Sequence, residues 1–466
     1  MTDHLAERPE PTAARTTQTA RASRLARVLG PGAATLLTLS CITPASSLFI
    51  IVPELLPQQG TGVVLALVAG VIVSAAVGCC YAELGTRTPS SGGEYAMVTH
   101  TLGRLTGWLT FVLCIALLVV IPPIIALGTA DYLADLLTLD RATAGAGVML
   151  LATATAILDI KSNAVVTSVF LALEVVAAAV VAGLGFAHAQ RNPVELVVPH
   201  VAAGDGGTAP FTLAILVSGL AVAMFVVNGF GTASYLAEEI HDPRRNVAKA
   251  VFWSLGLAAV VIVVPTIATV LGVADVHTLA TGNFSGFVRE WGGDGVAVAV
   301  NVGIAVAILN AVIVMVLQNG RVIYASARDR AWPDPVNRAL THIHPRFRSP
   351  WVSTLVVSIP GAVMAWTVDI ESLLGITSVI VSVIYVALAV GALAVRRQGS
   401  MPGWRMPLWP LPPLLVIGAI GYALLGSAPV DLWITAGIVV VALVYYAGYL
   451  APRRGDRFVV QAPVEE

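Results

Sequence analysis

The sequence predicts an all-α polytopic membrane protein with 12 transmembrane helices, and three observations support this fold class. Of its 466 residues, 57% are hydrophobic and only 11% are charged, whereas an average soluble domain is about 25% charged. Apolar stretches of about 20 residues, long enough to span a bilayer, recur along the chain. The basic residues separate onto one side of these stretches. This composition excludes a soluble enzyme.

The apolar stretches define the predicted helices in order. They cover roughly 33–56, 63–85, 104–134, 143–160, 163–187, 211–238, 250–274, 295–320, 351–367, 372–395, 408–426 and 430–450. Residues 1–30 are largely polar and lack the apolar core of a signal peptide. We expect residues 1–30 and 452–466 to be disordered cytoplasmic tails.

The Lys and Arg residues predict the orientation. With the N-terminus inside, 23 of the 26 basic residues lie on the inner side, and only Arg141, Arg191 and Arg289 lie outside. Cytoplasmic loops carry such an excess of positive charge. A wrong number of helices would mix the two sets. We therefore expect a multi-pass protein of the cell inner (cytoplasmic) membrane with both termini in the cytoplasm.

The first apolar segment contains an interruption at Thr43-Pro44-Ala45-Ser46-Ser47. Pro44 has no N–H, and its ring clashes with the carbonyl four residues earlier. An ordinary proline kink is one interpretation, because prolines are tolerated in membrane helices. The other is a helix that is unwound to present backbone groups to a solute.

The sixth segment contains a second interruption, at Asn228-Gly229-Phe230-Gly231. Glycines lower helix propensity, although they could also form a small-residue packing face. Segments one and six lie five spans apart and therefore cross the membrane in opposite directions. Two interrupted helices at matching positions indicate an inverted-repeat transporter. We therefore expect repeats over 31–190 and 191–397, followed by two more helices over 398–451.

The interruptions have the chemistry to bind an amino acid. The half-helix that begins after Pro44 directs free N–H groups and the positive end of its dipole at the break, where a carboxylate can bind. The preceding half-helices end in unpaired carbonyls, which suit an ammonium. No metal-binding or disulfide spacing links Cys41, Cys79, Cys80 and Cys114. We expect no metal and no cofactor.

Three motifs resemble signatures of the amino acid–polyamine–organocation (APC) superfamily. They are residues 82–95 (AELGTRTPSSGGEY), Gly229-Phe230 followed by residues 239–246 (EIHDPRRN), and Arg321 followed by residues 327–333 (ARDRAWP). The resemblance implies a leucine-transporter-like 5+5 inverted repeat and alternating-access transport of amino acids or related amines.

The resemblance also implies roles for individual residues. The substrate carboxylate would bind the amides of Ala45, Ser46 and Ser47, and the ammonium would meet carbonyls near Ile42, Thr43, Val226 and Val227. Asn228, Gly229 and Gly231 belong to the second break. Phe225 occupies the position of an aromatic residue that closes over the substrate. Many relatives carry Gly-Ser-Gly in the first break, where this chain has Ala45-Ser46-Ser47, and polyamine carriers often carry Glu at the position of Gly231.

Glu174 is the one acid deep inside an apolar segment. An ionisable residue within the membrane is a functional candidate by default. A proton-coupling role and a structural acid hydrogen-bonded to a neighbouring helix are both open interpretations.

Other polar residues have two interpretations each. Asn310 and Tyr385 could line the site from helices eight and ten, while helix–helix contacts are the simpler explanation. Glu83, Glu238 and Glu239 could pair with Arg87, Arg244 and Arg328 in an inner salt-bridge gate.

The function that these observations predict is a secondary active transporter of amino acids. Neutral substrates are favoured because neither break contains an acid, and a buried second ammonium would lack a counter-charge. Proton coupling through Glu174 is the expected energy source. The alternatives are an amino acid/amine exchanger, a polyamine or amine permease and, from a different class, a substrate-sensing transceptor. A channel would require a continuous polar stripe, whereas the polar residues here are scattered.

Overall fold

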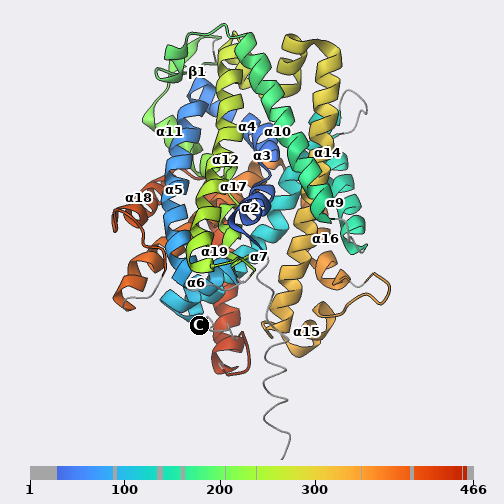
Figure 1. The fold of residues 1–466 in the computed structure, drawn as a ribbon, viewed down its shortest axis with the longest axis vertical. Helices are drawn as coiled ribbons and strands as arrows, with labels where there is room; N and C mark the ends of the chain where they lie inside the picture. Colours follow the sequence, from blue (N-terminus) through green and yellow to red (C-terminus); the bar gives the residue numbers. More distant parts are fainter. Residues whose placement is uncertain are drawn as a thin grey trace, which may run out of the picture.

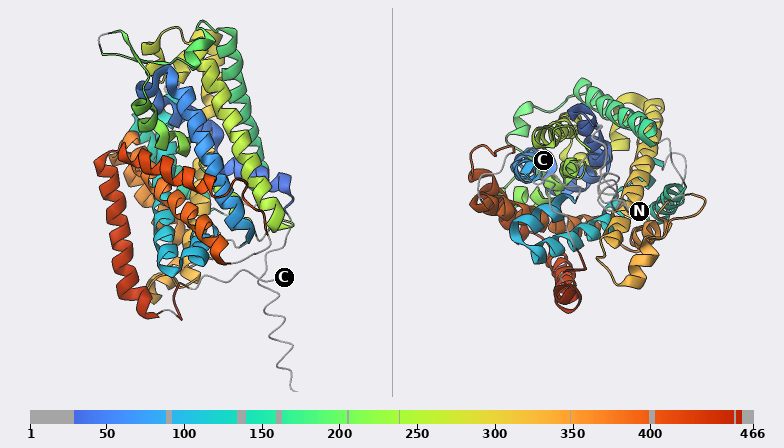
Figure 2. Two further views of the ribbon diagram at one scale, coloured as in Figure 1. Left: turned by 90° about the vertical axis from the view of Figure 1, so that its left-hand side faces the viewer. Right: turned by 60° about the horizontal axis from the view of Figure 1, so that its bottom comes forward.

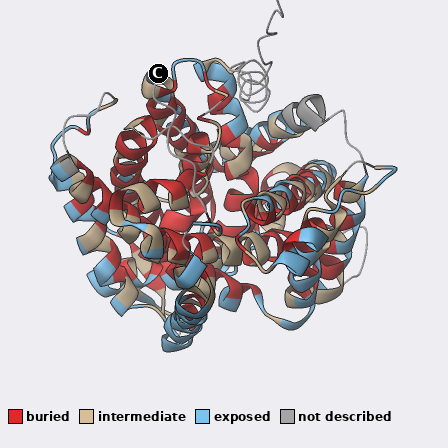
Figure 3. Ribbon diagram, turned by 90° about the horizontal axis from the view of Figure 1, so that it is seen from below, coloured by how far each residue is buried: buried red, intermediate tan, exposed pale blue. Residues whose placement is uncertain are grey.

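The computed structural model shows a bundle of helices that run mostly along its long axis (Figure 1). It describes residues 29–87, 92–133, 140–158, 163–204, 206–237, 239–347, 349–398, 403–453 and 455–458. The predicted N-terminal tail and Glu238 lie outside these residues. Figure 3 views the bundle from below and shows buried residues on the inner helices and exposed residues around the periphery.

The first half of the chain forms helices at most of the predicted positions. They are α2 (Pro31–Ile42), α3 (Pro44–Ser46), the π-helical turn η1 (Ser47–Ile51), α4 (Val52–Gln59), the 3-10 turn η2 (Gly60–Gly62), α5 (Val63–Arg87), α6 (Gly93–Leu102), α7 (Arg104–Leu127), α8 (Thr129–Leu133), α9 (Arg141–Ile157) and α10 (Asn163–Ala187). The first predicted segment is therefore divided among four helical pieces.

The second half begins with a small hairpin and continues as helices. Its elements are η3 (Pro193–Leu196), β1 (His200–Ala202), β2 (Thr208–Pro210), α11 (Leu213–Val226), η4 (Phe230–Ser234), α12 (Pro243–Gly272), α13 (Val276–Ala280), α14 (Phe284–Arg328), α15 (Asp334–Leu340), α16 (Trp351–Thr367), α17 (Ile370–Val395), η5 (Arg396–Gln398), α18 (Leu411–Leu425), α19 (Pro429–Tyr445), η6 (Tyr446–Leu450) and η7 (Ala451–Arg453). Helix α19 lies at the edge of the bundle (Figure 2).

Length and hydropathy support a polytopic membrane protein. Within the described residues, 8 helical stretches are long and apolar enough to cross a membrane, and the first of them, Pro31–Arg87, covers two predicted segments. Three shorter apolar helices, Arg141–Ile157, Trp351–Thr367 and Leu411–Leu425, coincide with further predicted segments. The full count of 12 crossings and the inverted repeat remain predictions.

The loop after α10 covers one end of the bundle. Strands β1 and β2 pair antiparallel, with Val201 opposite Ala209. The hairpin contacts the turn η2, where Thr61 Oγ1 accepts a hydrogen bond of 2.9 Å from the His200 N–H. Gly60 has φ +51, and a Cβ there would lie 2.3 Å from the His200 carbonyl oxygen, so only glycine permits this close approach.

A buried ion cluster ties together helices at the opposite end, where α6 and α15 lie (Figure 1). We call this end the arginine-rich end. The Glu83 carboxylate is fully buried and pairs with Arg87 at 2.7 Å and with Arg396 at 2.8 Å. Arg396 also donates to the Met406 carbonyl oxygen at 3.1 Å, which fixes the segment that follows α17.

This pairing corrects part of the predicted inner gate. Glu83 does pair with Arg87, but its second partner is Arg396, which lies far away in the sequence and was not among the predicted partners. Arg328 pairs with Asp329, its neighbour in sequence, at 3.5 Å. Among the described residues, Arg244 and Glu239 form no ion pair, so the Glu83 cluster acts as an anchor within the packed bundle.

Replacing Glu83 by Ala is expected to destabilise the fold by about 3–5 kcal/mol, because it leaves buried arginine charge without a partner. Thermal unfolding of the purified protein in detergent measures the change. Asp294→Asn removes an exposed partner of Arg289 and serves as the control, with an expected cost of about 0–1 kcal/mol. Equal melting temperatures for the two variants would contradict the anchor assignment.

The C-terminal segment 455–458 is packed against the bundle, unlike the disordered tail expected over 452–466. Phe458 is only 4% exposed and contacts Trp108 and Phe111 with ring centroids 5.1 and 5.4 Å apart. Arg104 donates to the Arg457 carbonyl oxygen at 2.5 Å. A short aromatic anchor therefore holds this segment at the arginine-rich end.

Candidate functional site

The first interruption is a true break in the backbone. Helix α2 ends at Ile42, and Thr43 adopts φ 48 and ψ 63, in the left-handed region. This conformation is strained for a β-branched residue. The position follows from the sequence, because the residue before a proline is disfavoured in the α conformation.

The chain resumes its helical path immediately after the break. Pro44 begins the short helix α3, and residues Ser47–Ile51 form a π-helical turn before α4. Such turns are rare and frequently occur at functional sites. Thr43, Ser46 and Ser47 are all buried, and the Ser46 hydroxyl has no hydrogen-bond partner among the described residues.

The second interruption lies between α11 and η4. Gly229 has φ +113, and the Asn228 side-chain oxygen accepts a 2.7 Å hydrogen bond from the Gly229 N–H. The glycine permits the left-handed turn, and the asparagine side chain satisfies the amide that the broken helix leaves free. The predicted helix 211–238 therefore ends at Val226.

The two breaks contact each other. A Cβ at Gly229 would lie 3.0 Å from Ile42 Cα and 3.2 Å from the Cys41 carbonyl oxygen. Gln318, on α14, lies close to Cys41, with 3.5 Å between Nε2 and Sγ. Residues that are far apart in sequence, on α2, at the turn before η4 and on α14, therefore meet at one place in the bundle.

Glu174 lies at the first break. Helix α10 contacts α3, and the Glu174 carboxyl lies against the backbone N–H of Ala45. The side chain is buried at 4% exposure, and its Oε2 has no hydrogen-bond partner among the described residues. A buried carboxyl whose oxygen lacks a hydrogen-bond partner is costly, which marks Glu174 as a candidate functional residue at the first break.

Tyr385 reaches the second break from α17. Its hydroxyl donates a 2.9 Å hydrogen bond to the Asn228 side-chain oxygen. Three further hydroxyls of the same helix are buried without a partner among the described residues: Thr377, Ser378 and Ser382. Orphaned buried hydroxyls commonly mark a place where water or a ligand supplies the missing hydrogen bond.

The remaining predicted residues occupy defined positions. Phe225 and Val226, both buried, end α11 directly before the second break, and Gly231 lies within η4. Ala45 is buried in α3. Asn310 is buried on α14, and within the described residues no hydrogen bond connects its side chain to either break. The structure thus brings together Glu174, Tyr385 and the two breaks.

Exposure differs on the two sides of the breaks. Cys41, Asn228 and Gly229 are half-buried and Gln318 is exposed, whereas Phe49 and Phe225 are buried. Cys41 is in α2, on the N-terminal side of the break, and Phe49 follows it. Access to the break is therefore greater on the α2 side than on the α4 side.

An aromatic cluster closes the α4 side of the first break. The Phe49 ring packs edge-on against Tyr132 at 6.0 Å and against Phe284 at 5.8 Å between centroids. The Tyr132 hydroxyl also donates to the Phe49 carbonyl oxygen. The sequence alone did not indicate this cluster, because its members come from three separate elements and no local pattern links them.

A second group that was not predicted surrounds Glu94. Its carboxylate accepts hydrogen bonds from Tyr81 at 2.6 Å and from Tyr235. The Tyr81 ring packs directly over Gly231, where a Cβ would lie 2.4 Å from its Cζ. The Tyr81 side chain, hydrogen-bonded to Glu94, therefore covers Gly231. In the sequence, the run GGEY at residues 92–95 was the pattern that could have indicated this group.

Comparison with known proteins identifies the family. A family model described as amino acid permease matches residues 29–454. An uncharacterized transporter of Mycobacterium tuberculosis is 27% identical over 383 residues, covering 79% of each chain. Human cationic amino acid transporter 4 is 26% identical, covering 74% of this chain and 55% of its own.

A third relative is named for a different substrate class. The rabbit large neutral amino acids transporter small subunit 2 is 26% identical over 364 residues, covering 76% of this chain and 65% of its own. The family model covers nearly the whole chain, including both breaks and α10. The chain belongs to the amino acid permease family and is a permease of the APC superfamily.

Proposed function

We propose that this permease is a secondary active transporter that moves neutral amino acids across the cytoplasmic membrane by alternating access and couples their movement to protons. The observation that carries the proposal is the meeting of two broken helices beside a buried carboxyl. Thr43 and Gly229 both leave the helical conformation with a positive φ. The two breaks are neighbours in space, because a Cβ at Gly229 would lie 3.0 Å from Ile42 Cα. Glu174 lies against Ala45.

The first break suits the substrate carboxylate. Pro44, Ala45 and Ser46 begin a half-helix, so the amides at its start carry the partial positive charge of a helix N-terminus. The Ser46 hydroxyl, which is buried and has no partner among the described residues, adds a donor at the same place. The carbonyls that end α2 and α11, at Ile42, Thr43, Val226 and Val227, suit the ammonium.

Neutral side chains fit the second break. Gly231 supplies no acid, and the apolar Phe225 and Val226 flank the break. The relatives include one named for large neutral and one named for cationic amino acids, so their names do not decide between the two classes. The absence of a charged side chain from both breaks, all of whose residues the structure describes, favours the neutral class.

Glu174 is proposed to carry the coupling proton. A proton on this carboxyl would neutralise it beside the bound substrate carboxylate, and its release would restore a negative charge that repels the substrate. Binding of proton and substrate would thereby be linked. Orientation follows from the basic residues: the arginine-rich end faces the cytoplasm, with both termini inside.

An exchanger of amino acids against amines is the second candidate. The Glu94 carboxylate, bonded to Tyr81 beside Gly231, is the observation that favours it, because it supplies a nearby negative charge for an amine. Uptake into proteoliposomes from a labelled panel of amino acids and amines separates the two. A carrier of neutral amino acids takes up the amino acids of the panel but not the amines.

Tyr385→Phe is expected to weaken substrate binding about 2- to 10-fold, because Asn228 loses a hydrogen bond worth roughly 0.5–1.5 kcal/mol and the second break becomes less well ordered. The KM of uptake measures the effect. Tyr445→Phe, which removes a 3.0 Å bond to the Ala331 carbonyl oxygen far from the breaks, is the matched control. An equal change of KM in both variants would contradict a role at the site.

A further inference from the structure

A cavity of about 650 Å³ lies at the arginine-rich end, away from the two breaks. It is lined by the end of α14, by α15 and by the C-terminal segment; the residues are Ala327, Arg328, Arg330, Asp334, Asn337, Arg338, Thr341, Asp456 and Arg457. Small-molecule sites commonly measure about 300–1,000 Å³. None of the residues at the two breaks lines this cavity.

The lining of the cavity carries an excess of positive charge. The lining contains four arginines and two aspartates, and one of the aspartates is paired with an arginine of the same lining. Arg457 Nη1 and Nη2 pair with the two Asp334 carboxylate oxygens at 2.7 and 2.8 Å. This hydrogen-bonded guanidinium holds the pKa of Asp334 below its usual value, so the pair remains ionised at neutral pH.

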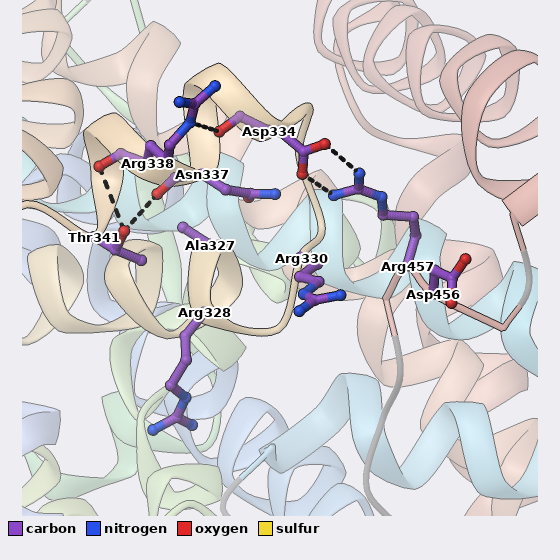
Figure 4. Close-up of a pocket in the computed structure, with 9 residues that line it drawn as sticks. All are labelled: Ala327, Arg328, Arg330, Asp334, Asn337, Arg338, Thr341, Asp456 and Arg457. Carbon is purple, nitrogen blue, oxygen red and sulfur yellow. Dashed lines mark hydrogen bonds and ion pairs between the residues drawn. The ribbon is translucent and has the colours of Figure 1, made fainter.

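Arg330 differs from the other arginines of the lining. No hydrogen bond or ion pair engages its guanidinium among the residues that the structure describes. It has φ +56, a strained conformation for a residue with a side chain. Figure 4 shows Arg330 between Arg328 and Arg457, with the Arg328 side chain extending away from the Asp334–Arg457 pair and Arg338 bonded to Asp334. Its guanidinium is therefore available to an anion.

The wall opposite α14 is fixed in place. The buried ring of Phe458 anchors the C-terminal segment, and Arg104 holds the Arg457 carbonyl oxygen at 2.5 Å. Asn337 hydrogen-bonds the backbone of Trp332 in both directions, at 3.2 and 2.5 Å, and so fixes the turn between α14 and α15. The cavity is a built feature of the fold.

We propose that this cavity binds the phosphate group of an anionic ligand, with Arg330 as its principal contact. Guanidinium forks match phosphate oxygens in pairs. The arginine-rich end is also the side on which anionic lipid headgroups are expected, and basic pockets at that level bind phosphate-bearing headgroups. A lipid headgroup and a soluble phosphate compound share this chemistry.

The function of such a site would be to connect α14 to the C-terminal segment. A phosphate bound by Arg330 beside the Asp334–Arg457 pair would add a contact between the end of α14 and the C-terminal segment, which Phe458 and Arg104 already hold in place. Because α14 also carries Gln318, which lies beside Cys41 at the first break, the ligand would stabilise the helix that borders the candidate transport site.

The test uses the full-length purified protein in nanodiscs of phosphatidylcholine. In one arm, phosphatidylglycerol is added to the bilayer; in the other, inorganic pyrophosphate is added to the solution. Binding is followed by the shift in melting temperature and by retention of the anion in native mass spectrometry. Arg330→Gln is expected to weaken binding about 10-fold, which corresponds to about 1.4 kcal/mol, and Arg330→Lys by less.

Arg245→Gln is the matched control, because Arg245 is an exposed arginine near the start of α12 and does not line the cavity. Weaker binding in Arg330→Gln alone supports the site, and the arm in which it occurs identifies the source of the phosphate. Equal losses in Arg330→Gln and Arg245→Gln would show only general surface attraction and overturn the proposal. Failure of both anions to bind the wild-type protein would overturn it as well.

Discussion

Glu174→Gln is expected to abolish accumulation of substrate against its gradient while leaving exchange across the membrane intact. Glutamine preserves the size and polarity of the side chain but cannot take up and release a proton. Because Glu174 lies against the Ala45 amide, with its second oxygen unpaired among the described residues, its charge directly affects the break proposed to bind the substrate carboxylate.

The expected size of the effect follows from the gradient. One pH unit supplies about 1.4 kcal/mol per proton, which corresponds to about a 10-fold concentration ratio. Wild-type proteoliposomes with one-to-one coupling should therefore accumulate substrate about 10-fold, and the variant should only equilibrate it. Glu195→Gln, which alters an acid of the loop after α10, is the control. Accumulation that persists in Glu174→Gln would refute proton coupling at this residue.

Gly229→Leu is expected to eliminate substrate binding. The position has φ +113, and a Cβ would lie 3.0 Å from Ile42 Cα and 3.2 Å from the Cys41 carbonyl oxygen. A leucine would therefore force apart the two broken helices, in addition to backbone strain of about 1–3 kcal/mol. We expect uptake to fall at least about 100-fold, with a smaller fall in Gly229→Ala.

Gly256→Leu provides the comparison for this prediction. Gly256 is exposed on α12, and a Cβ added there would meet no atom within 4 Å. Its uptake should equal that of the wild type. Size-exclusion profiles of all three variants report on folding, and substrate-induced thermal stabilisation reports on binding. Normal uptake by Gly229→Leu would exclude the second break as part of the site.

The interruptions of two helices were predictable because their causes are local. Pro44 removes a backbone donor and restricts Thr43, and Gly229 permits a left-handed turn. Each signal lies within a few residues of its effect. Composition likewise indicates a membrane protein, since hydropathy averages over whole segments.

Contacts between distant residues could not be predicted in the same way. Tyr385 and Asn228 are hydrogen-bonded across 157 residues of sequence, and Arg396 pairs with Glu83 across 313. Residue type and helix position indicated Tyr385 as a candidate, but they did not indicate its partner. The predicted gate was wrong in part for this reason, because Glu83 pairs with the distant Arg396 in addition to its sequence neighbour Arg87.

The prediction of a disordered C-terminal tail was wrong over 455–458 for a related reason. Basic and polar residues precede Phe458 in the sequence, and such composition is typical of a disordered segment. A single aromatic side chain that enters a cluster of Trp108 and Phe111 leaves no periodic signal. Local sequence therefore describes the composition of the segment but not the contacts that anchor it.

One site at the two breaks is proposed to bind a neutral amino acid together with a proton. Uptake of labelled amino acids into proteoliposomes, measured with and without an acidic exterior, separates this carrier from an exchanger. We predict accumulation of neutral amino acids above equilibrium only when the exterior is acidic. Uptake that ignores the pH gradient but rises strongly when substrate is loaded on the opposite side would contradict it and identify an exchanger.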